Sequence, residues 1–408
     1  MSNNFKKWLF IFFIAFSIRL IAAIFYLNFD PHALANEDGR QPFLPFGKSS
    51  NNIWEVVGDR DGYNTLAYNM LVYGKLGQVP NRNPSFPPPL YPVFLTICYC
   101  IFGFNIFGFF IPHIILDSVN SMLILSLGQQ VFSNKVGIIA SLLYALSPHF
   151  ILLSIQLYSE TLYFFLVLSL FLFCLKLFSK AYKKYSIYTG LAMALAALCR
   201  SAFLSFIPFM FIWLIAAFYH ERRKMLILLF GVFLSFSLVY GIWVARNIKA
   251  FPRILFFEAS RVAWWGTNSI SDTNESLKHR NKYKDDWSAF LNWVKDNPRQ
   301  YFNRCITRLR IFLFASYPAG VSNRNKIISS IIFFTIYPLA ILGITKAVKD
   351  KNKIAFLALL FIVSKIILHV LLGIEGELRY RLPVEIFVII FAASGLISIS
   401  KNYRTTCP

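Results

Sequence analysis

Apolar runs long enough to cross a lipid bilayer recur along the whole chain, and they constrain its fold more than any other feature. With 57% hydrophobic and 15% charged residues among 408, too few polar groups remain to cover a single water-soluble core. The sequence therefore predicts an all-α polytopic membrane protein, one transmembrane domain over residues 1–408, with about ten spans. The predicted spans are Trp8–Leu27, Ile106–Val131, Lys135–Leu152, Thr161–Leu177, Ile187–Leu198, Ala202–Phe218, Leu226–Val244, Ile327–Ile344, Ile354–Leu372 and Val384–Ile399.

Basic residues cluster between the apolar runs, and their positions orient the chain in the membrane. Lys6 and Lys7 precede the first run, and the tail begins Lys401-Asn402-Tyr403-Arg404. The positive-inside rule then places both termini in the cytoplasm, with the cell inner (cytoplasmic) membrane as the expected location. A signal peptide is the rival interpretation of the first run, but its core would be shorter and would end in small residues. Topology and anionic lipid explain the net charge of +22 better than nucleic acid does, because no single polar face collects the basic residues.

Two long polar segments are expected on the external face, residues 29–105 and 246–326. In the first, apolar residues at helical spacing predict a short helix lying in the membrane interface: Tyr63, Leu66, Ala67, Met70 and Leu71. The Pro87-Pro88-Pro89 run cannot continue a helix, and Leu90–Phe102 is short for a span, so a second juxtamembrane helix is expected there. In the second segment we expect a helix around Trp287–Val294.

This topology brings charged residues from distant parts of the sequence to one membrane face. Convergence of acids and bases there is typical of a site at the boundary between lipid and water. The residues that reach the external face are Asp59, Asp61, Glu160, Arg200, Arg246, Arg379 and Arg381.

Several short motifs, in their order along the chain, resemble those of one family. They are Asp59-x-x-x-Tyr63, Pro88-Pro89-Leu90-Tyr91-Pro92, Ser159-Glu160, Leu198-Cys199-Arg200, Arg246-Asn247 and Arg379-Tyr380-Arg381-Leu382-Pro383. This set resembles the polyprenyl-phosphate-sugar-dependent glycosyltransferases of the GT-C superfamily, especially the dolichyl-phosphate-mannose protein mannosyltransferases and the bacterial aminoarabinose lipid A transferases. The resemblance implies a GT-C-like bundle with juxtamembrane helices in the first external loop. It also implies inverting transfer of a sugar from a polyprenyl-phosphate carrier to an acceptor hydroxyl on a lipid, glycan or protein.

The resemblance assigns a role to each candidate residue. Asp59 is expected to act as general base on the acceptor hydroxyl, with Asp61 and Glu160 as further catalytic candidates. The leaving group is a lipid phosphate, so arginine N–H groups rather than a general acid would neutralise its charge. The expected phosphate-binding residues are Arg200, Arg246, Arg379 and Arg381, with Tyr380 as a hydrogen-bond donor. Tyr63 is an expected contact to sugar or acceptor. Apart from the resemblance, Trp264 and Trp265, beside Gly266-Thr267-Asn268, could contact the acceptor by stacking on a sugar face.

Each of these residues also has a simpler explanation. Either Asp59 or Asp61 could cap the helix that follows. Glu160 stands where a helix is expected to begin, and the helix dipole alone favours a carboxylate there. The arginines around Tyr380 could bind lipid headgroups, and the paired tryptophans could anchor the chain in the interface.

The chain also carries ionisable residues inside apolar runs, as well as several histidines. Asp117 and Lys365 lie within runs, where an unpaired charge costs about 2.5–3.5 kcal/mol or more, so each is expected to face the bundle interior or a cavity, or to pair with the other. Lys365 could instead snorkel. His113, His149, His220 and His369 lack metal-ligand spacing, so no metal site or cofactor is predicted. Some relatives in the superfamily use a divalent cation, which Asp59 and Glu160 could share.

Two other classes of function remain open on this sequence. A transporter or flippase of lipid-linked sugars is expected to show repeated halves and broken helices near the bilayer midplane, and neither is clear here. A non-catalytic protein that binds lipid-linked sugar is separable only by assay. Neither the sugar nor the acceptor can be read from the residues.

Overall fold

The computed structural model describes residues 3–29, 62–77, 88–250, 286–314, 323–372 and 380–406. Every regular element within these ranges is a helix, as the sequence predicts. The chain divides into two compact units. Unit 1 comprises Met1–Arg200 and Phe230–Trp243, and unit 2 comprises Ser201–Leu229 and Val244–Pro408.

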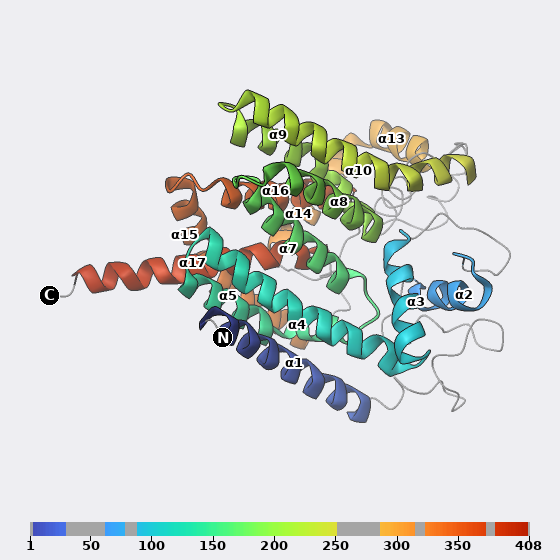
Figure 1. Cartoon of the computed structure of the whole chain (residues 1–408), viewed down its shortest axis with the longest axis horizontal. Helices are drawn as coiled ribbons and strands as arrows, with labels where there is room; N and C mark the ends of the chain where they lie inside the picture. Colours follow the sequence, from blue (N-terminus) through green and yellow to red (C-terminus); the bar gives the residue numbers. More distant parts are fainter. Residues whose placement is uncertain are drawn as a thin grey trace. The chain divides into compact units, whose positions relative to one another are not determined.

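In unit 1 the helices gather around α4, which packs against α1, α3, α5, α6 and α7 (Figure 1). Helix α7 packs in turn against α8. The helices are α1 (Asn3–Phe29), α2 (Tyr63–Tyr73), α3 (Leu90–Phe102), α4 (Ile106–Val131), α5 (Asn134–Leu146), α6 (Pro148–Ser154), α7 (Glu160–Lys176) and α8 (Tyr182–Cys199), with the middle of α10 (Arg222–Ala250).

Local sequence signals set the start of α4 and its contact with α5. Gly103 ends α3 at φ +85°, and Asn105 then accepts hydrogen bonds from the first backbone N–H groups of α4, as an N-cap residue does. Near the other end of α4, Gly128 lies against Gly137 of α5 so closely that a side chain on Gly128 would meet the Gly137 backbone at 2.8 Å. The two backbones therefore approach without side chains between them, as small residues allow in membrane helices.

The predicted span Lys135–Leu152 consists of two helices rather than one. The chain breaks at Ser147 between α5 and α6, and the two helices meet at an angle of 61°. Pro148 explains the break, because proline has no N–H for the preceding turn and forces the residue before it out of the helical region. Ser147 accordingly has φ −68° and ψ 121°.

The short helix expected from the apolar spacing, α2, is present where the sequence predicts it, and it buries polar residues together with most of the expected apolar ones. Of the expected apolar face, Tyr63, Leu66 and Ala67 are buried while Leu71 is 37% exposed. Polar residues are packed as well, because Tyr99 Oη of α3 donates a 2.8 Å hydrogen bond to Oδ1 of buried Asn64. Hydrogen bonding, rather than apolar spacing alone, therefore decides which side of α2 faces α3.

Unit 2 is organised around two helix contacts. Helices α15 and α17 cross where Gly343 and Gly395 bring the two backbones together, and α16 packs against η3, α9 and α14. The expected helix around Trp287–Val294 is confirmed as α13, whereas α14 was not predicted. The elements are η3 (Ser201–Phe206), α9 (Ile207–Phe218), α13 (Asp286–Asp296), α14 (Pro298–Phe314), α15 (Asn323–Lys349), α16 (Lys353–Leu372) and α17 (Leu382–Thr406), with the two ends of α10.

All ten predicted spans fall on helices, but fewer meet strict limits of length and apolarity. Among the described residues six helices do so, or seven if the bent α5–α6 pair counts as one span. Helix α7 has only 17 residues, and α8 and α15 also fall outside these limits. The multi-pass character is thus supported, and the total of about ten spans stays a prediction.

Candidate functional site

The first residue of α7 and the residue that follows α8 form an ion pair in unit 1. Glu160 is fully buried, and its carboxylate pairs with the Arg200 guanidinium, whose side chain is 14% exposed. The sequence places both residues at helix ends: Glu160 occupies the first turn of α7, where the helix dipole favours a carboxylate, and Arg200 caps α8. Because α7 packs against α8, the two charges meet.

Two hydroxyl groups and a thiol lie beside this ion pair. Ser159 Oγ is 3.5 Å from Arg200 Nη1 and 3.5 Å from Tyr63 Oη. Cys199 Sγ lies 3.6 Å from the Ser159 carbonyl oxygen. The tertiary structure therefore brings together three of the residues that the resemblance singles out, namely Tyr63, Glu160 and Arg200.

Tyr63 also connects this cluster to the proline-rich motif at the start of α3. Its ring packs edge-on against Tyr91, with centroids 4.7 Å apart and an interplanar angle of 81°. Tyr91 Oη in turn lies 3.0 Å from His113 Nε2 of α4. The motif Pro88-Pro89-Leu90-Tyr91-Pro92 thus supports one wall of the cluster through Tyr91.

This cluster gathers several hydrogen-bond donors around a paired arginine. The guanidinium N–H groups and the two hydroxyls are donors of the kind that bind phosphate oxygens. Glu160 balances the Arg200 charge, which lowers the cost of burying it. Together, these four residues form the Glu160 cluster: Tyr63, Ser159, Glu160 and Arg200.

The remaining described candidates belong to unit 2. Arg246 is half-buried near the end of α10, where its Nη1 donates a 2.9 Å hydrogen bond to Asn247 Oδ1. Tyr380 lies just before α17, with its ring centroid 6.3 Å from that of His369. Arg381 donates from Nε to Glu385 Oε1 at 2.7 Å, and its guanidinium carbon lies 5.8 Å from the Tyr337 ring centroid.

Five candidates lie outside the residues that the structure describes. They are Asp59, Asp61, Arg379, Trp264 and Trp265. The proposed base and the proposed tryptophan contacts therefore stay predictions.

Glu385 is a charged residue that sequence reasoning missed. It is buried in the first turn of α17, and both Nε and Nη2 of Arg381 reach its Oε1. The spacing of four residues between Arg381 and Glu385 was the available signal, since such residues face one another on a helix. The charge of Arg381 is therefore already balanced by Glu385.

Arg19 is the second charged residue that sequence reasoning missed. Asp117 pairs with Arg19, which stands in the middle of the first apolar run. A basic residue inside a predicted span was the signal, because such residues are expected to face a partner within the bundle. Lys365, in unit 2, instead donates from Nζ to the Ala202 carbonyl oxygen at 2.5 Å.

The suggested sharing of a divalent cation by Asp59 and Glu160 stays untested. In the described part of the chain no group of three or more His, Cys, Asp or Glu side chains has the geometry to hold a metal ion. Glu160 is engaged by Arg200, and its suggested partner Asp59 lies outside the described ranges.

Comparison with known proteins agrees with the resemblance drawn from the motifs. Residues 87–243 match the family described as dolichyl-phosphate-mannose-protein mannosyltransferase. No curated protein matches the chain. The archaeal oligosaccharyltransferase AglB from Archaeoglobus fulgidus, solved with an inhibitory peptide and a dolichol-phosphate, has a TM-score of 0.54 at 14% identity over 99% of this chain and 52% of that one. The apo form of the Archaeoglobus fulgidus enzyme gives 0.57 at 12% identity over 99% and 51%.

These matches establish the fold. The chain spans about half the length of the solved structures, and at 12–14% identity their likeness shows the fold alone. The predicted GT-C-like helical bundle is thereby confirmed, and with its apolar helices the chain is a multi-pass membrane protein. Together, the family match and the fold support transfer of lipid-linked sugars in general.

Proposed function

We propose that this chain, with residues 87–243 matching the dolichyl-phosphate-mannose-protein mannosyltransferase family and with the GT-C fold, is a polyprenyl-phosphate-sugar-dependent glycosyltransferase. It moves a hexosyl or pentosyl group from a polyprenyl-phosphate carrier to an acceptor hydroxyl. The reaction takes place at the external face of the inner membrane, with both termini in the cytoplasm. The acceptor is a lipid, a glycan or a protein.

The observation that carries the proposal is the position of the Glu160 cluster. Its residues Ser159, Glu160 and Arg200 lie within the family-matched stretch, and Tyr63 begins the helix that directly follows the acidic motif. One residue separates Asp61 from Tyr63, and three separate Asp59 from it. At no more than about 3.6 Å per residue, Asp59 Cα stays within about 14 Å of Tyr63 Cα. The proposed base is thus tethered near the proposed phosphate site.

The reaction balances with these groups alone. Asp59 accepts the proton of the acceptor hydroxyl as that oxygen attacks the anomeric carbon of the sugar. The bond between the anomeric carbon and the phosphate oxygen breaks, and the polyprenyl phosphate leaves as the anion. Attack from the side opposite the leaving group inverts the anomeric configuration.

Arginine side chains stabilise the charge of the leaving phosphate. Arg200, with the Ser159 and Tyr63 hydroxyls, donates to the leaving phosphate, and Glu160 holds the guanidinium in place. Arg246, Arg379 and Arg381, with Tyr380, are the second group of proposed donor contacts. Trp264 and Trp265 are the proposed stacking surface for the acceptor.

The test is sugar transfer by the purified chain in nanodiscs. A panel of radiolabelled polyprenyl-phosphate sugars is offered with extracted envelope acceptors, and wild type is compared with Asp59→Asn. Glu221→Gln is the matched control, because Glu221 is an exposed carboxylate. It pairs with Lys224, which lies one helical turn away. We expect Asp59→Asn to abolish transfer and Glu221→Gln to leave it unchanged.

Three other outcomes would change the assignment. Full transfer by Asp59→Asn would move the base to Asp61 or Glu160. Passage of lipid-linked sugar across the bilayer without transfer would favour a flippase. Donor binding by wild type with no transfer to any acceptor would favour a binding protein.

A further inference from the structure

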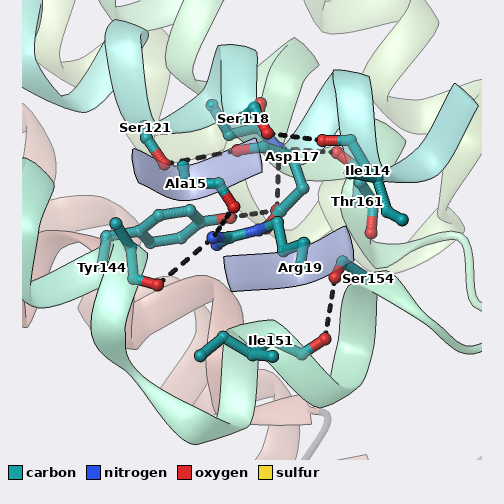
Figure 2. Close-up of polar contacts among 12 residues, drawn as sticks. Ala15, Arg19, Ile114, Asp117, Ser118, Ser121, Tyr144, Ile151, Ser154 and Thr161 are labelled. Carbon is teal, nitrogen blue, oxygen red and sulfur yellow. Dashed lines mark hydrogen bonds and ion pairs between the residues drawn. The ribbon is translucent and has the colours of Figure 1, made fainter. Parts of the chain in front are cut away.

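A buried ion pair joins α1 to α4 in the interior of unit 1. Arg19 Nε donates to Asp117 Oδ2, and both side chains are almost completely buried. Figure 2 shows the two side chains pointing toward one another, with the Tyr144 ring alongside. The Arg19 guanidinium carbon lies 5.6 Å from the centroid of that ring.

The contacts of this pair continue to α5. Tyr144 Oη donates to Asp117 Oδ1, so both carboxylate oxygens accept hydrogen bonds. Arg19 Nη1 donates to the Ala15 carbonyl at 3.1 Å and to the Ala145 carbonyl at 3.2 Å. Ala145 is in the last turn of α5, just before the break at Ser147, so Arg19 satisfies a carbonyl at a helix end that has few partners.

One residue extends the network to α7. Asn120 Nδ2 donates a 3.0 Å hydrogen bond to the Thr161 carbonyl oxygen and lies 3.4 Å from Asp117 Oδ1. Thr161 is the second residue of α7 and directly follows Glu160. A continuous set of polar contacts therefore runs from Arg19 through Asp117 and Asn120 to the turn that carries Glu160.

We propose that Asp117 and Asn120 are positioning residues for the Glu160 cluster. Asn120 holds the first turn of α7 by the Thr161 carbonyl, which fixes the direction from which Glu160 meets Arg200. Asp117 orients the Asn120 amide, and Arg19 with Tyr144 supplies the charge and the donor that keep Asp117 buried. This inference rests on the proposed function for its catalytic consequence, but its geometric part stands without it.

Stability alone is a weak reason for this arrangement. Well-packed apolar residues of similar volume usually stabilise a buried site as well as an ion pair does, because two charges must be desolvated to bury the pair. Directional hydrogen bonds, unlike apolar packing, fix the position of a backbone segment to a fraction of an ångström. The link from Asn120 to Thr161 uses that property at the one turn that presents Glu160.

The first test measures coupling between Asn120 and Glu160 without any assay of activity. Melting temperatures in nanodiscs are compared for wild type, Asn120→Ala, Glu160→Gln and the double variant. If Asn120 acts on Glu160, the two single shifts do not add in the double variant. Ser118→Ala is the matched control, because this buried α4 hydroxyl donates only to its own helix, to the Ile114 carbonyl at 2.7 Å. Its shift is expected to add to that of Glu160→Gln.

The second test measures catalysis in the same four proteins and in the Ser118→Ala control. Asn120→Ala is expected to lower kcat/KM for the lipid donor by about 10–100-fold, the effect of a small misplacement at a reacting site. In the Glu160→Gln background the same substitution is expected to change kcat/KM by less than twofold. Ser118→Ala is expected to leave the wild-type rate unchanged.

The outcomes separate this inference from the proposed function. Additive melting shifts for Asn120→Ala and Glu160→Gln overturn the positioning role, whatever the activity. Equal losses of kcat/KM by Asn120→Ala in both backgrounds also overturn it, because the effect would then bypass Glu160. If wild type transfers no sugar, the proposed function fails, and the melting-temperature cycle still decides the positioning role.

Discussion

Glu160 and Arg200 are 40 residues apart in the sequence, and their side chains form an ion pair where α7 begins and α8 ends. The carboxylate is fully buried, and the guanidinium is the charge that the structure places against it. Each residue is stable in this position because of the other. The Glu160–Arg200 contact therefore bears both on the stability of unit 1 and on the proposed chemistry.

Removing Arg200 alone is expected to be more harmful than removing both charges. Arg200→Ala leaves the buried Glu160 carboxylate without its counter-charge, which costs about 3–5 kcal/mol of unfolding free energy. Adding Glu160→Gln to the same chain should restore part of that loss. Thermal unfolding in nanodiscs checks this, and equal melting temperatures for Arg200→Ala and wild type would show that the pair is not energetically coupled.

The Arg19–Asp117 pair is expected to behave in the same way deeper in the bundle. Asp117→Ala strands a buried guanidinium and should cost about 3–5 kcal/mol, whereas the double variant Arg19→Met/Asp117→Leu should recover most of it. Glu221→Ala is the control, because this 56% exposed carboxylate pairs with Lys224 at a surface and should cost about 0–1 kcal/mol. Denaturant titration of the three variants measures the differences. A double variant as unstable as Asp117→Ala would contradict the explanation.

Contact between α15 and α17 is expected to depend on glycine. A methyl group on Gly343 would overlap the Phe391 carbonyl of α17, so Gly343→Ala should destabilise unit 2 by about 1–3 kcal/mol. Gly241 of α10 has no atom within 4 Å of such a methyl group. Gly241→Ala should therefore stabilise its helix by about 0.5–1 kcal/mol. Melting temperatures that move in opposite directions would confirm the contact, and parallel shifts would refute it.

Docking of α2 on α3 is expected to depend on one tyrosine hydroxyl. Tyr99→Phe removes the 2.8 Å hydrogen bond to Asn64 and should weaken the docking by about 1 kcal/mol. Hydrogen exchange across Tyr63–Tyr73 should become about five times faster, while exchange in α4 stays unchanged. Tyr68→Phe is the control, since the Tyr68 ring contacts Tyr73 and Phe104 and keeps those contacts without its hydroxyl. Unchanged exchange in Tyr99→Phe would show that packing alone holds α2.

Hydropathy and spacing were sufficient for most of the fold. The apolar run Ile106–Val131 coincides with α4, and the run Ile354–Leu372 lies within α16, because each is long enough to form a helix whatever its neighbours are. The break inside the predicted span Lys135–Leu152 was not predicted, although Pro148 is the local signal for it. The helix α14 was missed because its arginines and apolar residues alternate in a segment that reads as polar.

The position of a residue along a helix could be predicted from the sequence, whereas the pairing of residues on two different helices could not. Glu160 was expected at a helix start and is found there. Its pairing with Arg200 could not be read from either helix alone, since nothing in the spacing of 40 residues specifies it. The same holds for Asp117, for which Lys365 was one considered partner and Arg19 is the observed one.

The sequence by itself determined that this chain is helical, crosses a membrane several times and carries Glu160 at a helix start. These properties depend on local composition and on the cost of leaving backbone groups or charges in lipid, both of which are local in sequence. Only the tertiary structure decided which charge meets which, because the packing of α1, α4, α7 and α8 sets those distances. A buried charge must find a counter-charge, but which one it finds depends on which helices lie side by side.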